Sequence, residues 1–305
     1  MVYGGLVVFA VWCVLSFHKD LAQIHIESLH GGWAVVGAAG ALSLLNYALR
    51  IVRWQQYMNQ MGHRLPWRLS ALSYMAGFAF TLSPGKVGEM VRARYYLPYK
   101  IPLQDVTAAF FAERLMDLIV ILLLALAMLS AQPRYHMVMW LGLTLIGATI
   151  AALVAMPWAR VQQWLGTHPA ASRMHIRLMH GVAATLLNAR RFLSPGLLLP
   201  ALALGFIAWG AEAVGFKIVG DVIHPEGPMS WATAAGIYAL ATLVGALSFL
   251  PGGLGSTEAV MASLLYAQGF TVPDALLLTL ICRVLTLWLA VVIGWLCVYL
   301  LRHER

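Results

Sequence analysis

The chain has 305 residues, of which 61% are hydrophobic and 10% are charged, and its mean hydropathy is +0.78. A soluble globular domain averages about 25% charged residues, so this chain has too few charges to cover a water-facing surface. The composition predicts an integral membrane protein. It excludes a disordered chain, a disulfide-rich secreted domain and a nucleic-acid-binding module, despite the net charge of +8. At about 20 residues per span, roughly six to eight membrane segments are possible.

Eight apolar stretches follow one another along the chain. The first has neither a basic start nor a cleavage site, which predicts a retained span and not a signal peptide. Two later stretches are followed by helix-breaking residues, namely Pro84-Gly85 and Pro251-Gly252-Gly253. The eight stretches are 1–17, 33–53, 69–83, 103–131, 136–157, 195–219, 229–250 and 273–301.

Most lysines and arginines lie in four places: 50–68, 84–100, 158–191 and the C-terminal tail. Cytoplasmic loops of membrane proteins carry an excess of these residues. If every apolar stretch crossed the membrane once, the first two basic clusters would lie on opposite sides. We therefore predict that the two broken stretches are re-entrant helical hairpins. About six full spans then remain, both termini are cytoplasmic, and 158–191 is a cytoplasmic amphipathic segment on the lipid surface.

The sequences around the two breaks are similar. SPGKVGE covers residues 83–89 and LPGGLGSTE covers 250–258. Glu89 precedes Arg114 by 25 positions, and Glu258 precedes Arg283 by the same interval. We interpret this as a duplication within one membrane domain, 1–305. The halves 1–131 and 136–301 would have four elements each and opposite orientations. An inverted repeat with broken helices is typical of secondary transporters.

Proline and glycine explain the two breaks. Proline removes a backbone donor and clashes with the preceding turn, whereas glycine allows a positive φ and close approach. Non-helical backbone at membrane depth persists only where protein or water satisfies it. The alternative is an ordinary kinked helix. The predicted hairpin-breaking residues are Pro84, Gly85, Gly88, Pro251, Gly252, Gly253 and Gly255.

Several charged residues lie within or beside apolar stretches. A charge at the bilayer centre costs roughly 2.5–3.5 kcal/mol on insertion scales, so each needs a partner. In one interpretation they line a polar cavity in which arginines bind a phosphate and glutamates bind a cation or carry a proton. In the other, Glu89–Arg114 and Glu258–Arg283 are structural ion pairs that hold each hairpin to its long helix. The candidate substrate-binding residues are Glu89, Arg92, Glu113, Arg114, Asp117, Glu258 and Arg283, and Glu212 also needs a partner.

The sequence lacks the usual signatures of catalysis. Lys86 does not lie in a phosphate-binding GxxxxGK[ST] loop, and no GxSxG, HExxH or dinucleotide fingerprint occurs. The histidines, among them His168, His175 and His180, fit no metal-ligand spacing. We therefore expect no enzyme activity, no catalytic residues, no cofactor and no metal site.

The motifs resemble those of a known family. The pairing of SPGKVGEMVRARYY…AAFFAERLMDLIV with LPGGLGSTEAVMASLLYAQGF…ALLLTLICRVLTLW is similar to the lysylphosphatidylglycerol-synthase transmembrane-region family, also called UPF0104 or flippase-like membrane proteins. The resemblance covers about 35 to 300 and places the family's polar positions on the candidate residues named above. One departure is that Thr286 stands in the second half where Asp117 stands in the first, so the halves are not functionally equivalent.

The resemblance implies lipid translocation without specifying the lipid. In multi-domain members this region resembles a flippase for aminoacylated phosphatidylglycerol, and a separate cytosolic domain makes that lipid. No such domain is seen here, so the chain resembles stand-alone members linked to glycosylated, polyprenyl-phosphate or hopanoid-related lipids.

We therefore expect a lipid flippase in the bacterial cytoplasmic (inner) membrane. Its partners would be the bilayer, a phosphate-bearing lipid substrate and a lipid-modifying enzyme, and no nucleic acid. The alternatives are an ion-coupled carrier of a small anion and a non-transporting scaffold for a lipid-modifying enzyme. A lipid carrier should have a cavity open sideways, a solute carrier should be sealed from lipid, and a scaffold should have fully paired charges.

Overall fold

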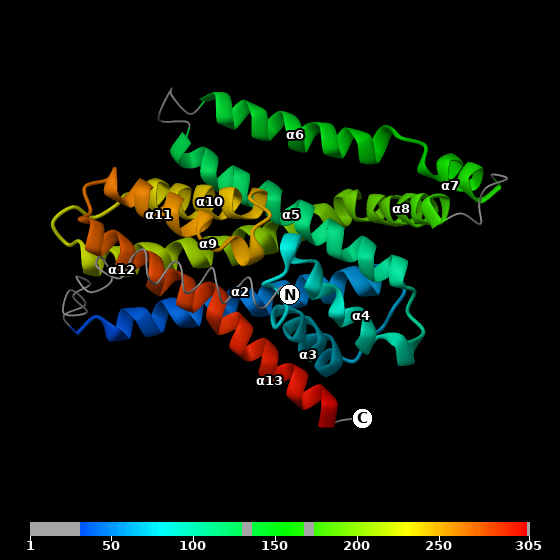
Figure 1. Cartoon of the computed structure of the whole chain (residues 1–305), viewed down its shortest axis with the longest axis horizontal. Helices are drawn as coiled ribbons and strands as arrows, with labels where there is room; N and C mark the ends of the chain where they lie inside the picture. Colours follow the sequence, from blue (N-terminus) through cyan, green and yellow to red (C-terminus); the bar gives the residue numbers. More distant parts are fainter. Residues whose placement is uncertain (1–30, 130–135, 168–173, 304–305) are drawn as a thin grey trace.

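The computed structural model describes residues 31–129, 136–167 and 174–303, and every regular element in these ranges is helical. This confirms the all-α class. The predicted first span, 1–17, lies outside the described residues. The longer helices are α2 (Trp33–Gln60), α3 (Trp67–Phe78), α5 (Leu103–Leu129), α6 (His136–Ala155), α7 (Trp158–Thr167), α8 (Met174–Arg190), α9 (Pro195–Ile223), α10 (Trp231–Leu247), α11 (Ser256–Tyr266), α12 (Val272–Arg283) and α13 (Leu289–His303) (Figure 1). The short elements are η2 (Pro84–Val91), α4 (Arg92–Tyr95), η3 (Leu97–Tyr99), η5 (Arg191–Leu193), η6 (Pro251–Gly253) and the π-helical turn η7 (Val284–Trp288).

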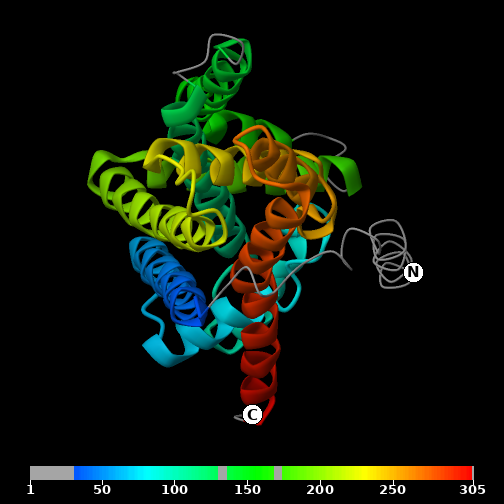
Figure 2. The same ribbon diagram turned by 90° about the vertical axis from the view of Figure 1, so that its left-hand side faces the viewer.

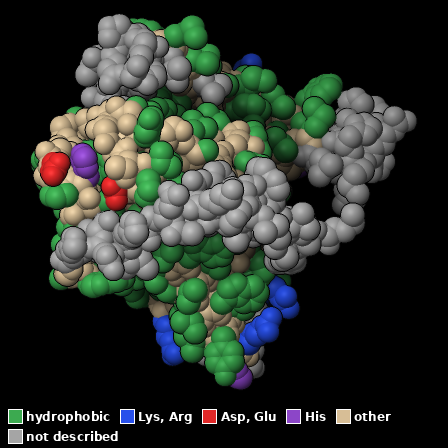
Figure 3. Space-filling view, turned by 60° about the vertical axis from the view of Figure 1, so that its left-hand side comes forward, with side chains coloured by type: hydrophobic (Ala, Val, Ile, Leu, Met, Phe, Trp, Pro, Cys, Tyr) green, Lys and Arg blue, Asp and Glu red, His purple; other side chains and the backbone are tan. Residues whose placement is uncertain are grey.

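Three described helical segments are long and apolar enough to cross a membrane: α2, α9 and the continuous run Val272–His303 that joins α12, η7 and α13. A fourth results if the bent pair α6 and α7 forms one span. On the face seen in Figure 3, many of the coloured side chains are hydrophobic, as expected of a surface that contacts lipid. On that face, lysines and arginines gather at the end of the molecule where α13 finishes.

Helix α2 is longer than the apolar stretch that predicted it. The stretch was placed at 33–53, but the helix continues to Gln60, and Arg50 and Arg53 are buried within it. Assigning these arginines to a basic cytoplasmic loop was therefore wrong. The error came from ending the helix at a charge, although both arginines have carboxylate partners inside the protein.

Both predicted breaks are present. Helix α3 ends at Phe78, and the following turn η2 contains Gly85 with φ 60° and Lys86 with φ 58°. Helix α10 ends at Leu247, and η6 contains Gly252 with φ 62°. The positive φ values show that the backbone leaves the helical conformation altogether, which goes beyond an ordinary kink.

The two hairpins differ after their breaks. In the second, α11 returns against α10 as a helix of 11 residues. In the first, α4 is a single turn of 4 residues and the chain continues through η3. Among the predicted glycines, Gly88 is the one without a positive φ, and it is needed because a Cβ there would lie 2.5 Å from the carbonyl oxygen of Phe80.

The helices pack in a reciprocal pattern (Figures 1 and 2). Helix α2 packs along α9, α3 packs against α13, and α10 packs against α5. The breaks η2 and η6 lie against each other, with Leu82 beside Gly252. The hairpin from each half of the chain therefore contacts the last long helix of the other half, and the two breaks meet in the interior.

The segment predicted as one cytoplasmic amphipathic stretch, 158–191, contains two helices, α7 and α8. Helix α8 packs against α5, with a weaker contact to α6. This arrangement places α8 beside the charged middle of α5, where it forms one wall of a groove described below.

Candidate substrate-binding site

Helix α5 carries three charges near its middle: Glu113, Arg114 and Asp117. Their i,i+1 and i,i+4 spacing places both carboxylates on one helical face. Helix α2 packs against that face and presents Arg50 and Arg53, which are also one turn apart. Both carboxylates are at most 3% exposed, so their charges depend on protein partners and not on water.

Asp117 is held from three sides. Arg53 Nη2 lies 2.6 Å from its Oδ1, and Arg50 Nη2 lies 3.2 Å from its Oδ2. The indole nitrogen of Trp209 on α9 donates to Oδ1 at 3.1 Å. Asp117 therefore ties α5 to both α2 and α9.

Glu113 is the most highly coordinated carboxylate. Its Oε1 accepts a short hydrogen bond from the Tyr74 hydroxyl and lies 3.3 Å from both Arg50 Nη2 and Arg114 Nη2. Its Oε2 lies 3.4 Å from Arg92 Nη1. The group thus joins α3 and α4 to α2 and α5.

The first break supplies the third carboxylate. Glu89 in η2 is fully buried, with its Oε2 2.9 Å from Arg92 Nη2 and 3.6 Å from Arg114 Nη2. Thr81 donates to its Oε1 at 2.9 Å. The Arg92 guanidinium carbon lies 4.5 Å from the ring centroids of both Trp54 and Tyr74, two cation–π contacts that stabilise a buried cation.

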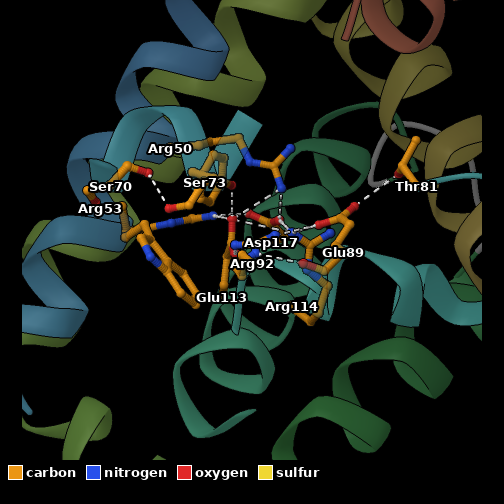
Figure 4. A network of polar contacts seen from close by, with 12 residues as sticks. Arg50, Arg53, Ser70, Ser73, Thr81, Glu89, Arg92, Glu113, Arg114 and Asp117 are labelled. Carbon is orange, nitrogen blue, oxygen red and sulfur yellow. Dashed lines mark hydrogen bonds and ion pairs between the residues drawn. The ribbon is translucent and has the colours of Figure 1, made fainter. Parts of the chain in front are cut away.

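These groups form one connected unit, which we call the ionic network (Figure 4). Its members are Arg50, Arg53, Glu89, Arg92, Glu113, Arg114 and Asp117.

The ionic network has more donors than acceptors. Four arginines face three carboxylates, which leaves a formal charge of +1. Several buried guanidinium nitrogens find no hydrogen-bond partner, namely the Nε atoms of Arg50, Arg53 and Arg114, Nη1 of Arg53 and Nη2 of Arg114. Buried donors without a partner are uncommon in native structures. This excess can accept an anion.

The second break has a smaller and more exposed site. Arg283 Nε lies 2.6 Å from Glu258 Oε1, and Arg283 Nη2 donates to the carbonyl oxygen of Gly252 at 2.6 Å. The backbone nitrogen of Gly255 donates to Glu258 Oε2 at 2.7 Å. Arg283 therefore holds both the acid and the break, whereas in the first half Arg114 contacts the acid Glu89 and Arg92 donates to the backbone carbonyl of the break at Glu89.

A polar cavity of about 70 Å³, the central cavity, lies between the ionic network and the Glu258–Arg283 pair. Each water occupies about 30 Å³ in the liquid, so the cavity has room for roughly two. It is too small for a lipid head group as it stands. Its polar lining includes Asn46, Tyr47, Arg50, Thr81, Lys86, Glu212, Tyr238, Thr242, Thr257, Arg283 and Thr286.

A much larger groove of about 1160 Å³, the lateral groove, lies between α5, α6 and α8. Most of its lining is apolar, and Leu103, Phe111 and Val182 are more than half exposed, so it is open to the outside. Among the described residues that line it, Arg114 alone is charged. Its side chain is 19% exposed here while its inner face contacts the ionic network. One arginine thus connects an apolar surface groove with a buried charged centre.

The structure gathers the predicted residues into two places. Five lie in the ionic network, whereas Glu258 and Arg283 form the separate pair across the central cavity. Both ion pairs suggested by the 25-residue interval are present. Sequence reasoning missed Arg50 and Arg53 as members of the network, and Tyr74 as a hydrogen-bond donor to Glu113. The sequence did contain a sign of the two arginines, because two cations three positions apart at the end of an apolar run lie on one helical face.

In the described part of the chain, no three His, Cys, Asp or Glu side chains gather as metal ligands would.

The fold and the site define an integral membrane protein of helices, with two broken helical hairpins around a buried ionic network. Comparison with known proteins identifies the group. Residues 2–294 match the family model of the lysylphosphatidylglycerol synthase TM region, so the chain belongs to this family, as its motifs suggested. It is also 26% identical over 285 residues to a UPF0104 membrane protein from Methanothermobacter thermautotrophicus, covering 86% of this chain and 82% of that protein.

Proposed function

We propose that this protein moves a lipid with a phosphate-bearing head group across the bacterial cytoplasmic membrane. The head group would be glycosylated, polyprenyl-linked or aminoacylated. The observation that carries the proposal is the lateral groove, which is apolar along its length and has Arg114 as its charged point. Such a groove fits an amphiphile, because acyl chains lie against apolar walls while a guanidinium binds a phosphate through two parallel hydrogen bonds.

The other candidate functions fit less well. A carrier of a small soluble anion has no need of an apolar groove open to the outside. A scaffold would have its charges fully paired, but the ionic network holds four arginines for three carboxylates, and Nε and Nη1 of Arg53 have no hydrogen-bond partner. An enzyme would need a nucleophile and a base, and the sequence carries no motif that supplies such a pair. We therefore propose transport without a chemical reaction. The family supports a role linked to lipids.

We further propose the topology that the sequence suggested: an inverted repeat with about six full spans, two re-entrant hairpins, and both termini in the cytoplasm. The reciprocal packing of α3 on α13 and of α10 on α5 supports a repeat, because symmetric halves exchange corresponding contacts. Alternating access would then involve rocking of the halves around the meeting point of η2 and η6. The central cavity, now with room for water alone, would widen when a head group enters.

Lipid transport in proteoliposomes tests the proposal. Purified protein is reconstituted with a fluorescent polyprenyl-phosphate sugar or, separately, with an aminoacylated phosphatidylglycerol. We expect one lipid to move, and Arg114→Gln to slow it about tenfold or more, because a charge-assisted contact contributes about 1.5–3 kcal/mol. Arg114→Lys keeps the charge but loses the forked geometry, so its rate should be intermediate.

The matched control is Arg94→Gln, which removes an exposed arginine from the same end of the first hairpin. It should transport at the wild-type rate. Wild-type levels of transport by a folded Arg114→Gln protein would contradict the site assignment. Failure of the wild type to move either lipid would favour the scaffold and solute-carrier functions.

A further inference from the structure

Glu212 lies near the middle of α9, with 4% of its surface exposed. It lines the central cavity, as do Arg50 of the ionic network and Arg283 of the second site. It also borders a smaller cavity of about 10 Å³ between α2, α9 and α12. This carboxyl group therefore borders both internal cavities.

Its bonding differs from that of the other buried acids. Each carboxylate of the ionic network lies within ion-pair distance of at least two arginines, and Glu258 pairs with Arg283. Glu212 has one hydrogen bond, from the Ser43 hydroxyl at 2.9 Å, and no described lysine or arginine pairs with it. An ionised carboxylate removed from water and from cations is costly, whereas the protonated acid needs hydrogen bonds alone. The site is therefore suited to a proton.

The groups around Glu212 determine how a proton could leave. Trp209, one turn earlier on α9, donates to Asp117 of α5, so the nearest acid on that helix is already engaged. The charged and titratable groups that face the same space are Tyr47 and Arg50 from α2, Tyr238 from α10, Cys282 and Arg283 from α12, and Lys86 from η2. Because the cavity has room for roughly two waters, Glu212 can exchange its proton with water held in the cavity.

We propose that Glu212 is a proton-binding site that controls the anion affinity of the central cavity. When the proton is bound, the carboxyl group is neutral and Arg50 and Arg283 attract an anionic head group. When the proton leaves to water, the new carboxylate competes with that anion and promotes its release. No bond other than O–H is made or broken. The coupling rests on the proposed lipid transport, whereas proton binding by Glu212 stands independently.

Infrared spectroscopy tests proton binding without any transport. The protonated carboxyl group has a C=O stretch that shifts in heavy water. In a pH titration of the reconstituted wild type, one component of this band should come from Glu212, and Glu212→Gln should lose that component. The control Glu226→Gln removes an exposed acid and should retain it. An identical band and titration in Glu212→Gln would overturn the proposal.

Transport under a pH gradient tests the coupling. One pH unit changes the ratio of protonated to ionised acid about tenfold near its midpoint, so the wild-type rate should change several-fold with pH. Glu212→Gln should be insensitive to pH while Glu226→Gln behaves as the wild type. Wild-type pH dependence in Glu212→Gln would overturn the coupling. If the wild type moves no lipid, the transport proposal fails, and the infrared titration still decides whether Glu212 binds a proton.

Discussion

Asp117 shows how a single residue organises this protein. Its two oxygens receive Arg50, Arg53 and Trp209, which come from α2 and α9. None of these partners is within 60 residues of it in the sequence. The carboxylate is therefore a point at which three long helices are joined, and its charge offsets two arginines that have little access to water.

Replacing Asp117 by asparagine keeps the shape of the side chain and removes its charge. The formal charge of the ionic network would rise from +1 to +2, leaving Arg53 without its closest ion-pair partner. Breaking a buried pair by removing one partner typically costs about 3–5 kcal/mol, so we expect a destabilisation of that order. Denaturation of purified protein, followed by circular dichroism, measures it. Glu226→Gln, at an exposed acid, should stay within about 0.5 kcal/mol of the wild type.

At the scale of residues, the equal 25-residue spacing between an acid and an arginine in each half correctly indicated two ion pairs. The Glu89–Arg114 and Glu258–Arg283 pairs both form, at 3.6 Å and 2.6 Å. Sequence reasoning was wrong for Arg50 and Arg53, which were placed in a loop. An arginine at the end of an apolar run fits equally a membrane boundary and a buried partner, and the choice depends on which helix packs beside it.

At the scale of elements, the contact between α3 and α13 depends on close backbone approach. A Cβ added at Gly294 of α13 would lie 2.4 Å from the backbone nitrogen of Ala79 and 2.9 Å from the carbonyl oxygen of Met75. Both atoms belong to the chain at or just after α3, so neither can rotate away as a side chain could. Small residues at such crossings are common in membrane proteins because packing drives helix association there.

Gly294→Ala should therefore separate α3 from α13 and destabilise the protein by about 1–3 kcal/mol, the usual cost of overpacking. The matched control is Gly210→Ala in α9, where a Cβ would meet nothing within 4 Å. That change should be neutral or slightly stabilising, because alanine favours a helix over glycine. Thermal unfolding in detergent compares the two. Equal midpoints would mean that the helices can slide apart at little cost.

The broken hairpins were predictable because their signal is local. Pro84 and Pro251 cannot continue a helix, and the glycines after them adopt positive φ in the structure. The difference between the hairpins was not predictable in this way. The first returns as the single turn α4, whereas the second returns as α11, although their sequences are similar.

At the scale of the whole molecule, the lateral groove and the ionic network meet at Arg114. The groove walls come from α5, α6 and α8, which are brought together by folding. Filling the groove from α6 tests its role without touching any charged residue. Ala152 lines the groove and is exposed within it, whereas its neighbour Ala151 is also exposed but does not line it.

Ala152→Trp should reduce lipid transport several-fold, because the indole would occupy space that an acyl chain needs. Ala151→Trp adds the same side chain one position away and should leave transport unchanged. Both proteins should unfold at the wild-type midpoint, since neither residue is in the core. Equal transport by the two variants would indicate that lipid takes another route.

The sequence alone determined that this is a helical membrane protein with two helix breaks, each followed by an acid and a distant arginine. These properties depend on composition and on the local chemistry of proline, glycine and charge. The tertiary structure decided which charges pair, where the lateral groove lies and that no lysine or arginine among the described residues forms an ion pair with Glu212. The physical reason is that lipid-facing and interior-facing side chains are both apolar in a membrane protein. Periodicity therefore does not distinguish the two faces, and the partners of a buried charge are set by helices that meet only when the chain folds.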